Sequence, residues 1–133
     1  MLTHADLFGH VAHKPKQRYV RREGAALVEV MLALRVHPAV AWFERMNVGC
    51  VKIENRFVRF GFPGCTDVLG QMKDGRILVV EVKSPTGELS PEQRAFLIKV
   101  RRAGGVAFMA RNLNDVRAGF AADALRRLQT QKD

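Results

Sequence analysis

Three ionisable residues in the middle of the chain have the types and spacing to do chemistry together. Glu81 and Lys83 lie in or directly after the apolar run at 78–82, and Asp67 lies in an earlier apolar stretch. A run of this kind is typical of a strand that is buried on both faces. Buried Glu and Lys are rare unless they are paired or bind a metal. Two charges at this position therefore need a physical reason.

The elements around these residues predict that they meet. Residues 66–72 and 76–83 read as two strands, and the Asp-Gly pair between them is a strong hairpin signal. Because side chains alternate along a strand, Glu81 and Lys83 share one face. The hairpin should place Asp67 across from this end of the partner strand. The sequence thus predicts two carboxylates and one ammonium group at one end of a hairpin.

This constellation suits a divalent cation and phosphodiester hydrolysis. Two close carboxylates without compensation would force one of them to keep its proton, and a cation removes that conflict. Carboxylate oxygens suit Mg²⁺ or Mn²⁺, which lower the pKa of a bound water and polarise a phosphorus centre. A neighbouring lysine can position that water or stabilise charge on the phosphoryl oxygens. The alternative is a structural ion pair of Glu81 with Lys83, because Glu-x-Lys triplets are common.

A long helix predicted for residues 17–36 carries a fourth candidate. Within residues 25–34 the only charged residue is Glu29. The segment is apolar nearly all round, which predicts a largely buried helix and a carboxylate in a poorly solvated place. Glu29 then either fills a gap in the packing beside an arginine or faces a metal or a catalytic lysine.

A second helix should begin directly after the Glu-x-Lys strand. Ser90, Pro91 and Gln93 match an N-cap, a first helical position and a capping-box position. Asn112 or Asn114 can cap a last helix. The other expected elements are short strands at 39–46, 51–53, 57–60 and 106–110.

The charge points to a polyanionic partner. The 133 residues include 22 Lys and Arg against 13 Asp and Glu, a formal net charge of +9. Nucleic acid is the first partner that this charge indicates, and a membrane surface is the second. The sequence has no apolar stretch near the roughly 18 residues of a spanning helix and no signal-peptide core, so a cytoplasmic protein without membrane association is expected. The candidate DNA contacts are Arg18, Arg21, Arg22, Arg101 and Arg102.

Residues 1–16 are polar and basic, and we expect them to form a mobile leader before a single domain over residues 17–133.

The sequence PGCTD at 63–67, followed by EVK at 81–83, resembles the PD-(D/E)XK nuclease signature. Thr66 stands where that signature often has a proline directly before the aspartate. The longer stretches FPGCTDVLG, DGRILVVEVKSPTGELSPEQRAF and RRAGGVAFMARNLND resemble a VRR-NUC domain over roughly residues 23–116.

The resemblance implies an α/β, restriction-endonuclease-like fold with a mixed central sheet flanked by helices. It also implies roles at the centre of the site. Asp67 and Glu81 would bind Mg²⁺ or Mn²⁺, with help from the backbone carbonyl of Val82. Lys83 would orient or activate the attacking water.

Two further residues match the family pattern. Glu29 matches an acidic residue of the first helix that touches the site, often through water or a second metal. Gln93 matches a glutamine that approaches the lysine or the scissile phosphate, although the capping box explains a glutamine at this position equally well.

The implied activity is that of a metal-dependent endodeoxyribonuclease. Stand-alone members of this family resemble Holliday junction resolvases, so we expect a homodimer that cuts branched DNA. The alternatives are a flap- or nick-directed nuclease, a general nickase, and a non-catalytic DNA-binding protein.

Overall fold

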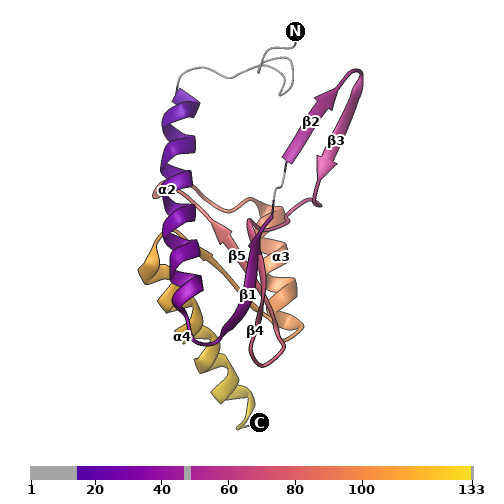
Figure 1. Cartoon of the computed structure of the whole chain (residues 1–133). Helices are drawn as coiled ribbons and strands as arrows, with labels where there is room; N and C mark the ends of the chain where they lie inside the picture. The colour runs from indigo at the N-terminus through magenta and orange to yellow at the C-terminus, as the bar shows by residue number, and fades with distance from the viewer. Residues whose placement is uncertain (1–14, 47–48, 133) are drawn as a thin grey trace.

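A four-stranded mixed sheet with the strand order β1-β4-β5-β6 forms the centre of the domain (Figure 1). The computed structural model describes residues 15–46 and 49–132. Antiparallel pairing joins β1 to β4 and β4 to β5, whereas β5 and β6 are parallel. The strands are β1 (Val40–Arg45), β4 (Val68–Met72), β5 (Ile77–Val82) and β6 (Val106–Ala110). The mixed central sheet flanked by helices that the family resemblance implied is confirmed.

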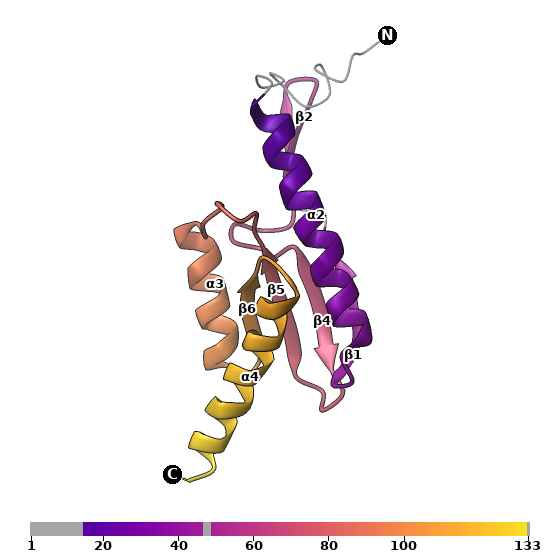
Figure 2. The same ribbon diagram turned by 90° about the vertical axis from the view of Figure 1, so that its left-hand side faces the viewer.

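Within the described residues, three helices cover this sheet. They are α2 (Pro15–Val36), α3 (Pro91–Arg102) and α4 (Leu113–Thr130). The first turns of α2 extend past the end of the sheet (Figure 2). The helices α2 and α4 share one hydrophobic core with residues of the sheet, and α3 packs in a second core on the other face. The central strand β5 contributes to both cores, which confirms that it is buried on both faces.

The predicted helix starts agree with the observed caps. Ser90 caps α3, with its hydroxyl accepting a hydrogen bond from the backbone N–H of Gln93, and the complete capping box is present. Asn112 caps α4 and accepts a hydrogen bond from the backbone N–H of Asp115. Local polar side chains therefore determine where both helices begin.

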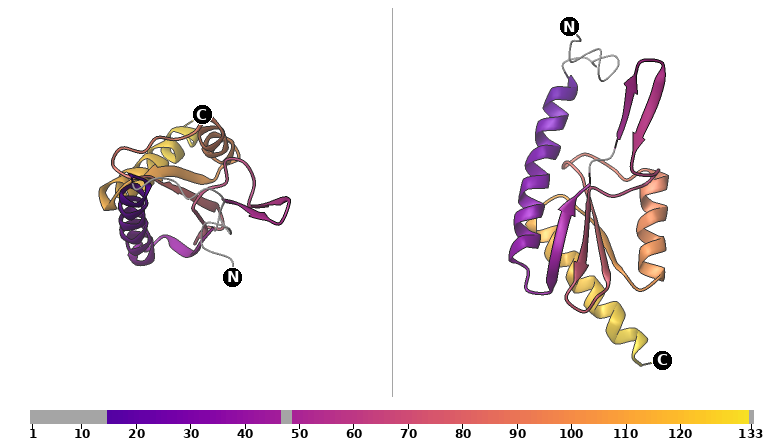
Figure 3. Two further views of the ribbon diagram at one scale, coloured as in Figure 1. Left: turned by 90° about the horizontal axis from the view of Figure 1, so that it is seen from above. Right: turned by 45° about the vertical axis from the view of Figure 1, so that its right-hand side comes forward.

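A second, two-stranded sheet stands apart from the central one. It is the hairpin of β2 (Gly49–Ile53) and β3 (Arg56–Phe60), which projects away from the domain (Figure 3). Glu54 at its tip has a φ of 55°, the left-handed conformation that a tight two-residue turn requires. Residues 52–58 are all exposed, including Ile53 and Phe57 at 52% and 72% of their full accessible areas. This ribbon therefore gains little stability from burial.

The expectation that the apolar segment of α2 is largely buried is wrong. One face of the helix is in the core, where Val30 and Leu34 are almost fully buried. The other face carries Val28, Leu32 and Val36, which are exposed at 61%, 55% and 78%. The reason is that α2 lies in an outer layer, so the sheet and α4 cover only one side of it. Composition alone does not tell how many faces of a helix find a neighbour.

The leader expected at 1–16 falls largely outside the part of the chain that the structure describes, because residues 1–14 are not described. Pro15 and Lys16 are already helical, since α2 begins at Pro15. A single nuclease domain over 17–133 stays a prediction.

An ion pair joins the β4–β5 turn to α4. Both guanidinium N–H groups of Arg76 donate to the carboxylate of Asp123, at 2.8 and 3.0 Å, and Asp123 is buried. The hydrogen bonds to Asp123 raise the pKa of Arg76, so its guanidinium stays charged. This contact fixes the end of the hairpin that lies away from Glu81.

Candidate active site

Asp67 lies directly before β4, across the hairpin from the end of β5. The register pairs Val68 with Val80. One carboxylate oxygen of Asp67, Oδ2, accepts a 2.8 Å hydrogen bond from the backbone N–H of Val82. The hairpin therefore holds the Asp67 carboxylate at the end of β5 that carries Glu81, across the hairpin as predicted.

Glu81 is the most constrained carboxylate of the site. It is only 2% exposed. Its Oε1 accepts a 2.7 Å hydrogen bond from Nε2 of Gln93 and lies 3.3 Å from Nζ of Lys83. Its Oε2 is buried and has no hydrogen-bond partner among the described residues. A buried, unpaired carboxylate oxygen is costly, so this atom needs either a proton or a cation.

The electrostatics of Glu81 follow from this geometry. The pKa of Glu81 is raised from 4.5 to about 8, chiefly by burial of the carboxyl group and next by the negative charge of Asp67. The ammonium of Lys83 lowers the pKa but does not outweigh the other two effects. Interaction with the Asp67 side chain also favours the protonated form of Glu81 and so raises its pKa. At neutral pH, the pair without a cation should therefore hold one proton.

The side chain of Gln93 makes two hydrogen bonds, one at the helix cap and one to the active site. Its Oε1 accepts a 2.9 Å hydrogen bond from the backbone N–H of Ser90, which completes the capping box of α3. Its Nε2 donates to Glu81 at 2.7 Å. The two explanations of this glutamine are therefore compatible. An amide is the side chain that can accept at the cap and donate to the carboxylate at once.

The loop before Asp67 lies against the first turn of α3. Gly64 has a φ of +84°, and a Cβ at this position would lie 2.5 Å from the carbonyl oxygen of Glu92. The rings of Phe62 and Phe96 pack edge to face, 5.0 Å apart. Only glycine combines this backbone conformation with so close an approach. The segments that carry Asp67 and Gln93 are thus packed together.

Glu29 does not have the environment that the sequence predicted. The expectation of a poorly solvated carboxylate is wrong, because Glu29 is exposed on α2. Its Oε1 accepts a 3.0 Å hydrogen bond from the backbone N–H of Leu113, the first residue of α4. Among the described residues, no hydrogen bond or ion pair joins it to Asp67, Glu81 or Lys83.

Glu29 nevertheless lies near the same end of the sheet. The carbonyl oxygen of Ala110, three residues before Leu113, accepts a hydrogen bond from the backbone N–H of Lys83. The carboxylate of Glu29 and the end of β5 are therefore both joined to the segment that leads from β6 into α4.

The five arginines predicted to contact DNA fall in two places. Arg18, Arg21 and Arg22 lie in the first turns of α2, and their side chains are outside the described part of the structure. Arg101 and Arg102 lie at the end of α3 that is remote from Gln93, and both are exposed. None of them has a tested role.

The donor set fits a hard divalent cation. Asp67 and Glu81 supply two carboxylates, and Oε2 of Glu81 has a free lone pair and no competing donor. The described residues contain no cluster of three or more His, Cys, Asp or Glu side chains. The remaining ligands of Mg²⁺ or Mn²⁺ would therefore be backbone oxygen, such as the carbonyl of Val82, and water.

Comparison with known proteins identifies one family. The family model of the VRR-NUC domain matches residues 15–112, which is most of the chain. No curated protein and no solved structure matches the sequence. In the described part of the chain, every helix is too short or too polar to cross a membrane.

The raised pKa of Glu81 predicts a pH-dependent stability for the metal-free protein. The folded protein holds this proton more tightly than the unfolded chain, so the contribution is favourable below about pH 4.5 and is lost as the pH rises through about 8. In Glu81→Gln, which cannot ionise, this loss disappears. In EDTA, we expect Glu81→Gln to melt close to the unsubstituted protein at pH 5 and well above it at pH 8.5. If Glu81→Gln differed from the unsubstituted protein by the same Tm at pH 5 and at pH 8.5, the raised pKa of Glu81 would be contradicted.

The double role of Gln93 predicts that capping and site geometry can be separated. Ser90→Ala removes the hydroxyl cap and should lower the free energy of unfolding by about 1 kcal/mol, with little effect on Mn²⁺ affinity. Gln93→Ala should lower stability and also weaken Mn²⁺ binding, because Glu81 loses its 2.7 Å donor. Calorimetric titration of both variants measures this. Identical Mn²⁺ affinities would mean that Gln93 is only a capping residue.

Proposed function

We propose that this chain, which belongs to the VRR-NUC domain family of the PD-(D/E)XK nucleases, is a divalent-metal-dependent endodeoxyribonuclease. The observation that carries the proposal is the buried Glu81 carboxylate, with one oxygen unpaired, beside Asp67 and Lys83. A structural ion pair would need only Glu81 and Lys83. The second carboxylate makes the pair unfavourable without a proton or a cation, which favours a metal site over a structural pair.

Each side chain has a distinct task in the proposed hydrolysis. Asp67 and Glu81 would hold Mg²⁺ or Mn²⁺, with the backbone carbonyl of Val82. The bound cation supplies a water of lowered pKa and polarises the phosphorus. Lys83, whose ammonium lies 3.3 Å from Glu81, orients the attacking water or stabilises charge on the phosphoryl oxygens. The reaction adds this water across one P–O bond, leaving a phosphate monoester and a hydroxyl group.

Gln93 and Glu29 act around this centre. Gln93 directs Oε1 of Glu81 toward α3 and so leaves Oε2 for the cation. Glu29 would reach the site through water or a second metal, as the family pattern suggests. Its hydrogen bond to Leu113 gives it a second task, since it holds the start of α4 near the end of β5.

The substrate we propose is branched DNA. With a net charge of +9, the chain can contact many phosphates, and such contacts read shape rather than sequence. Resolution of a four-way junction requires two cuts, and a symmetric homodimer supplies two active sites. A flap- or nick-directed nuclease is the second candidate, and a non-catalytic DNA-binding protein would have no need for the buried carboxylate pair.

The exposed face of α2 supports a homodimer. Val28, Leu32 and Val36 are spaced four residues apart and so lie on one side of the helix, and all three are more than half exposed. A second copy of the same helix, running antiparallel about a two-fold axis, offers the same stripe in return. The stripe is therefore self-complementary, as an isologous interface requires.

The metal assignment predicts separate effects on binding and on chemistry. Asp67→Ala should abolish both Mn²⁺ binding and cleavage of a labelled four-way junction. Lys83→Ala should keep Mn²⁺ binding and most of the DNA affinity but lower the cleavage rate by about 100-fold or more, as expected for loss of a key electrostatic group. Quenched-flow cleavage, calorimetry and anisotropy measure the three quantities. Full cleavage by Asp67→Ala would overturn the proposed metal site.

The α2 stripe predicts the oligomeric state. Leu32→Glu should convert the dimer to a monomer in analytical ultracentrifugation, because it places a charge in the apolar stripe. Leu125→Glu is the matched control, since Leu125 is equally apolar and 62% exposed but lies on α4. The monomer should lose paired cuts in opposing strands of a junction while it still nicks DNA. A dimer that survives Leu32→Glu would exclude this surface.

A further inference from the structure

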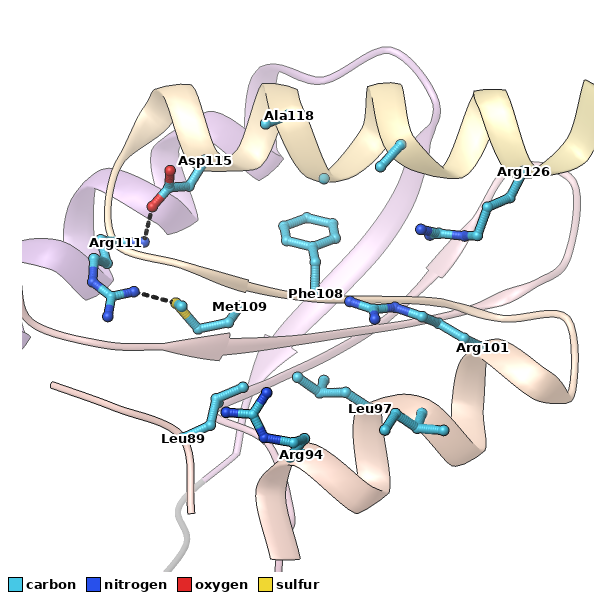
Figure 4. A pocket seen from close by; sticks show the side chains of 13 residues that line it. Leu89, Arg94, Leu97, Arg101, Phe108, Met109, Arg111, Asp115, Ala118 and Arg126 are labelled. Carbon is cyan, nitrogen blue, oxygen red and sulfur yellow. Dashed lines mark hydrogen bonds between the residues drawn. The ribbon is translucent and has the colours of Figure 1, made fainter. Parts of the chain in front are cut away.

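A groove of about 600 Å³ lies between α3 and α4, along the edge strand β6 (Figure 4). Its floor is formed by Phe108 and Met109 of β6, and its apolar walls include Leu97 of α3 and Ala118 of α4. This volume lies in the range of sites that bind a small molecule or a similar-sized part of a larger ligand.

The wall on α4 is open because its residues are small. A Cβ at Gly119 would overlap the ring of Phe108, so the aromatic ring packs directly against the helix backbone. Ala118 and Ala122 continue this wall, and both are exposed to the groove. Phe108 itself is only 4% exposed, so the apolar surface that the groove presents comes from partly exposed side chains such as Met109, Ile98 and Ala118.

Four arginines surround this apolar floor. Arg94 and Arg101 come from α3, Arg111 follows β6, and Arg126 comes from α4. None of them forms an ion pair with a carboxylate among the described residues. Asp115, the one acidic residue in the lining, already accepts a 2.9 Å hydrogen bond from the backbone N–H of Arg111.

The cations are held in place against their mutual repulsion. Arg101 donates from Nε to the carbonyl oxygen of Ala107 at 2.7 Å, which fixes its guanidinium over the edge strand. Burial, and then the positive charge of Arg126, lowers the pKa of Arg101. Arg111 donates to the carbonyl oxygen of Gly87. An anion between the two helices would relieve this repulsion.

We propose that this groove binds a single strand of DNA, with phosphates on Arg94, Arg101 and Arg126 and a base against the apolar floor. Cations that track a backbone beside an apolar surface for bases are what single-strand binding requires. The inference rests on the proposed nuclease function and deepens it.

Two arginines of the groove directly follow residues that are hydrogen-bonded to the candidate active site, although no residue of that site lines the groove. Arg94 is adjacent to Gln93, whose side chain donates to Glu81. Arg111 follows Ala110, whose carbonyl oxygen accepts from the backbone N–H of Lys83. A strand in the groove would thus lead to or from the reacting phosphate. Among the branched DNAs proposed as substrates, a strand bound in this way favours the second candidate, a flap with a single-stranded arm at the branch point, over the four-way junction.

Binding in EDTA tests the groove without cleavage. Fluorescence anisotropy would measure the affinity for a labelled single strand and for a blunt duplex. The measurement is made on the unsubstituted protein and on the double variant Arg101→Gln/Arg126→Gln. The matched control is Lys99→Gln/Arg102→Gln, which removes the same charge from exposed residues that do not line the groove. The groove variant should bind the single strand roughly tenfold more weakly. The plot of log K against log salt concentration should become shallower. The magnitude of its negative slope should decrease by about 1.4, or about 0.7 for each lost phosphate contact.

A second variant keeps the test valid if the loss of the Arg101 hydrogen bond disturbs β6. Ala122→Leu fills the groove from an exposed helical position and leaves the charge unchanged, so it should weaken single-strand binding but not duplex binding. Equal losses in the groove and control double variants, or full single-strand affinity in Ala122→Leu, would overturn the groove proposal.

Cleavage in Mn²⁺ separates this proposal from the nuclease function. If no DNA is cut but the groove variants lose single-strand binding selectively, then the groove proposal stands and the nuclease proposal fails. If DNA is cut and the groove variants cut a flap and a blunt junction as the unsubstituted protein does, then the groove proposal fails alone.

Discussion

A carboxylate in the middle of the sheet sets the main constraint on this domain. Glu81 lies on the central strand, is 2% exposed, and has Asp67 beside it. Leaving a buried carboxylate uncompensated is expensive, so the neighbouring elements supply partners for it. Lys83 contributes charge, Gln93 contributes a hydrogen bond, and the backbone N–H of Val82 neutralises part of the charge on Asp67. One oxygen of Glu81 remains without a partner, and a proton or cation has to complete the site.

The layers of the fold follow from the same constraint. The first turn of α3 must lie against the end of β5, because Gln93 has to reach Glu81 while it also caps the helix. Gly64 permits the loop before Asp67 to pack on that turn. Capping, loop packing and site electrostatics are therefore one arrangement, and a change in any of them should affect the others.

The sequence predicts this centre well because it depends on local rules. Strand alternation and the Asp-Gly turn place Asp67 opposite Glu81, and the capping box places Gln93 at the start of α3. The predicted environment of Glu29 is wrong, because the composition of α2 does not tell which of its faces the sheet covers. The arginine groove was missed for a related reason. Its cations come from α3, the β6–α4 loop and α4, and only tertiary packing brings them together. The small residues at 118, 119 and 122, with an arginine at 126, were the available signal.

The two surfaces that we propose as binding sites do not compete. The α2 stripe of Val28, Leu32 and Val36 lies on a helix that contributes no residue to the groove lining. The groove opens along β6, the edge strand on the far side of the sheet from β1. A dimer through α2 would therefore leave the groove of each protomer open. Edge strands usually need protection from unwanted pairing, and Arg101 already covers the carbonyl oxygen of Ala107 here. The same arginine would thus protect the free edge of the sheet and bind the phosphate backbone of a DNA strand.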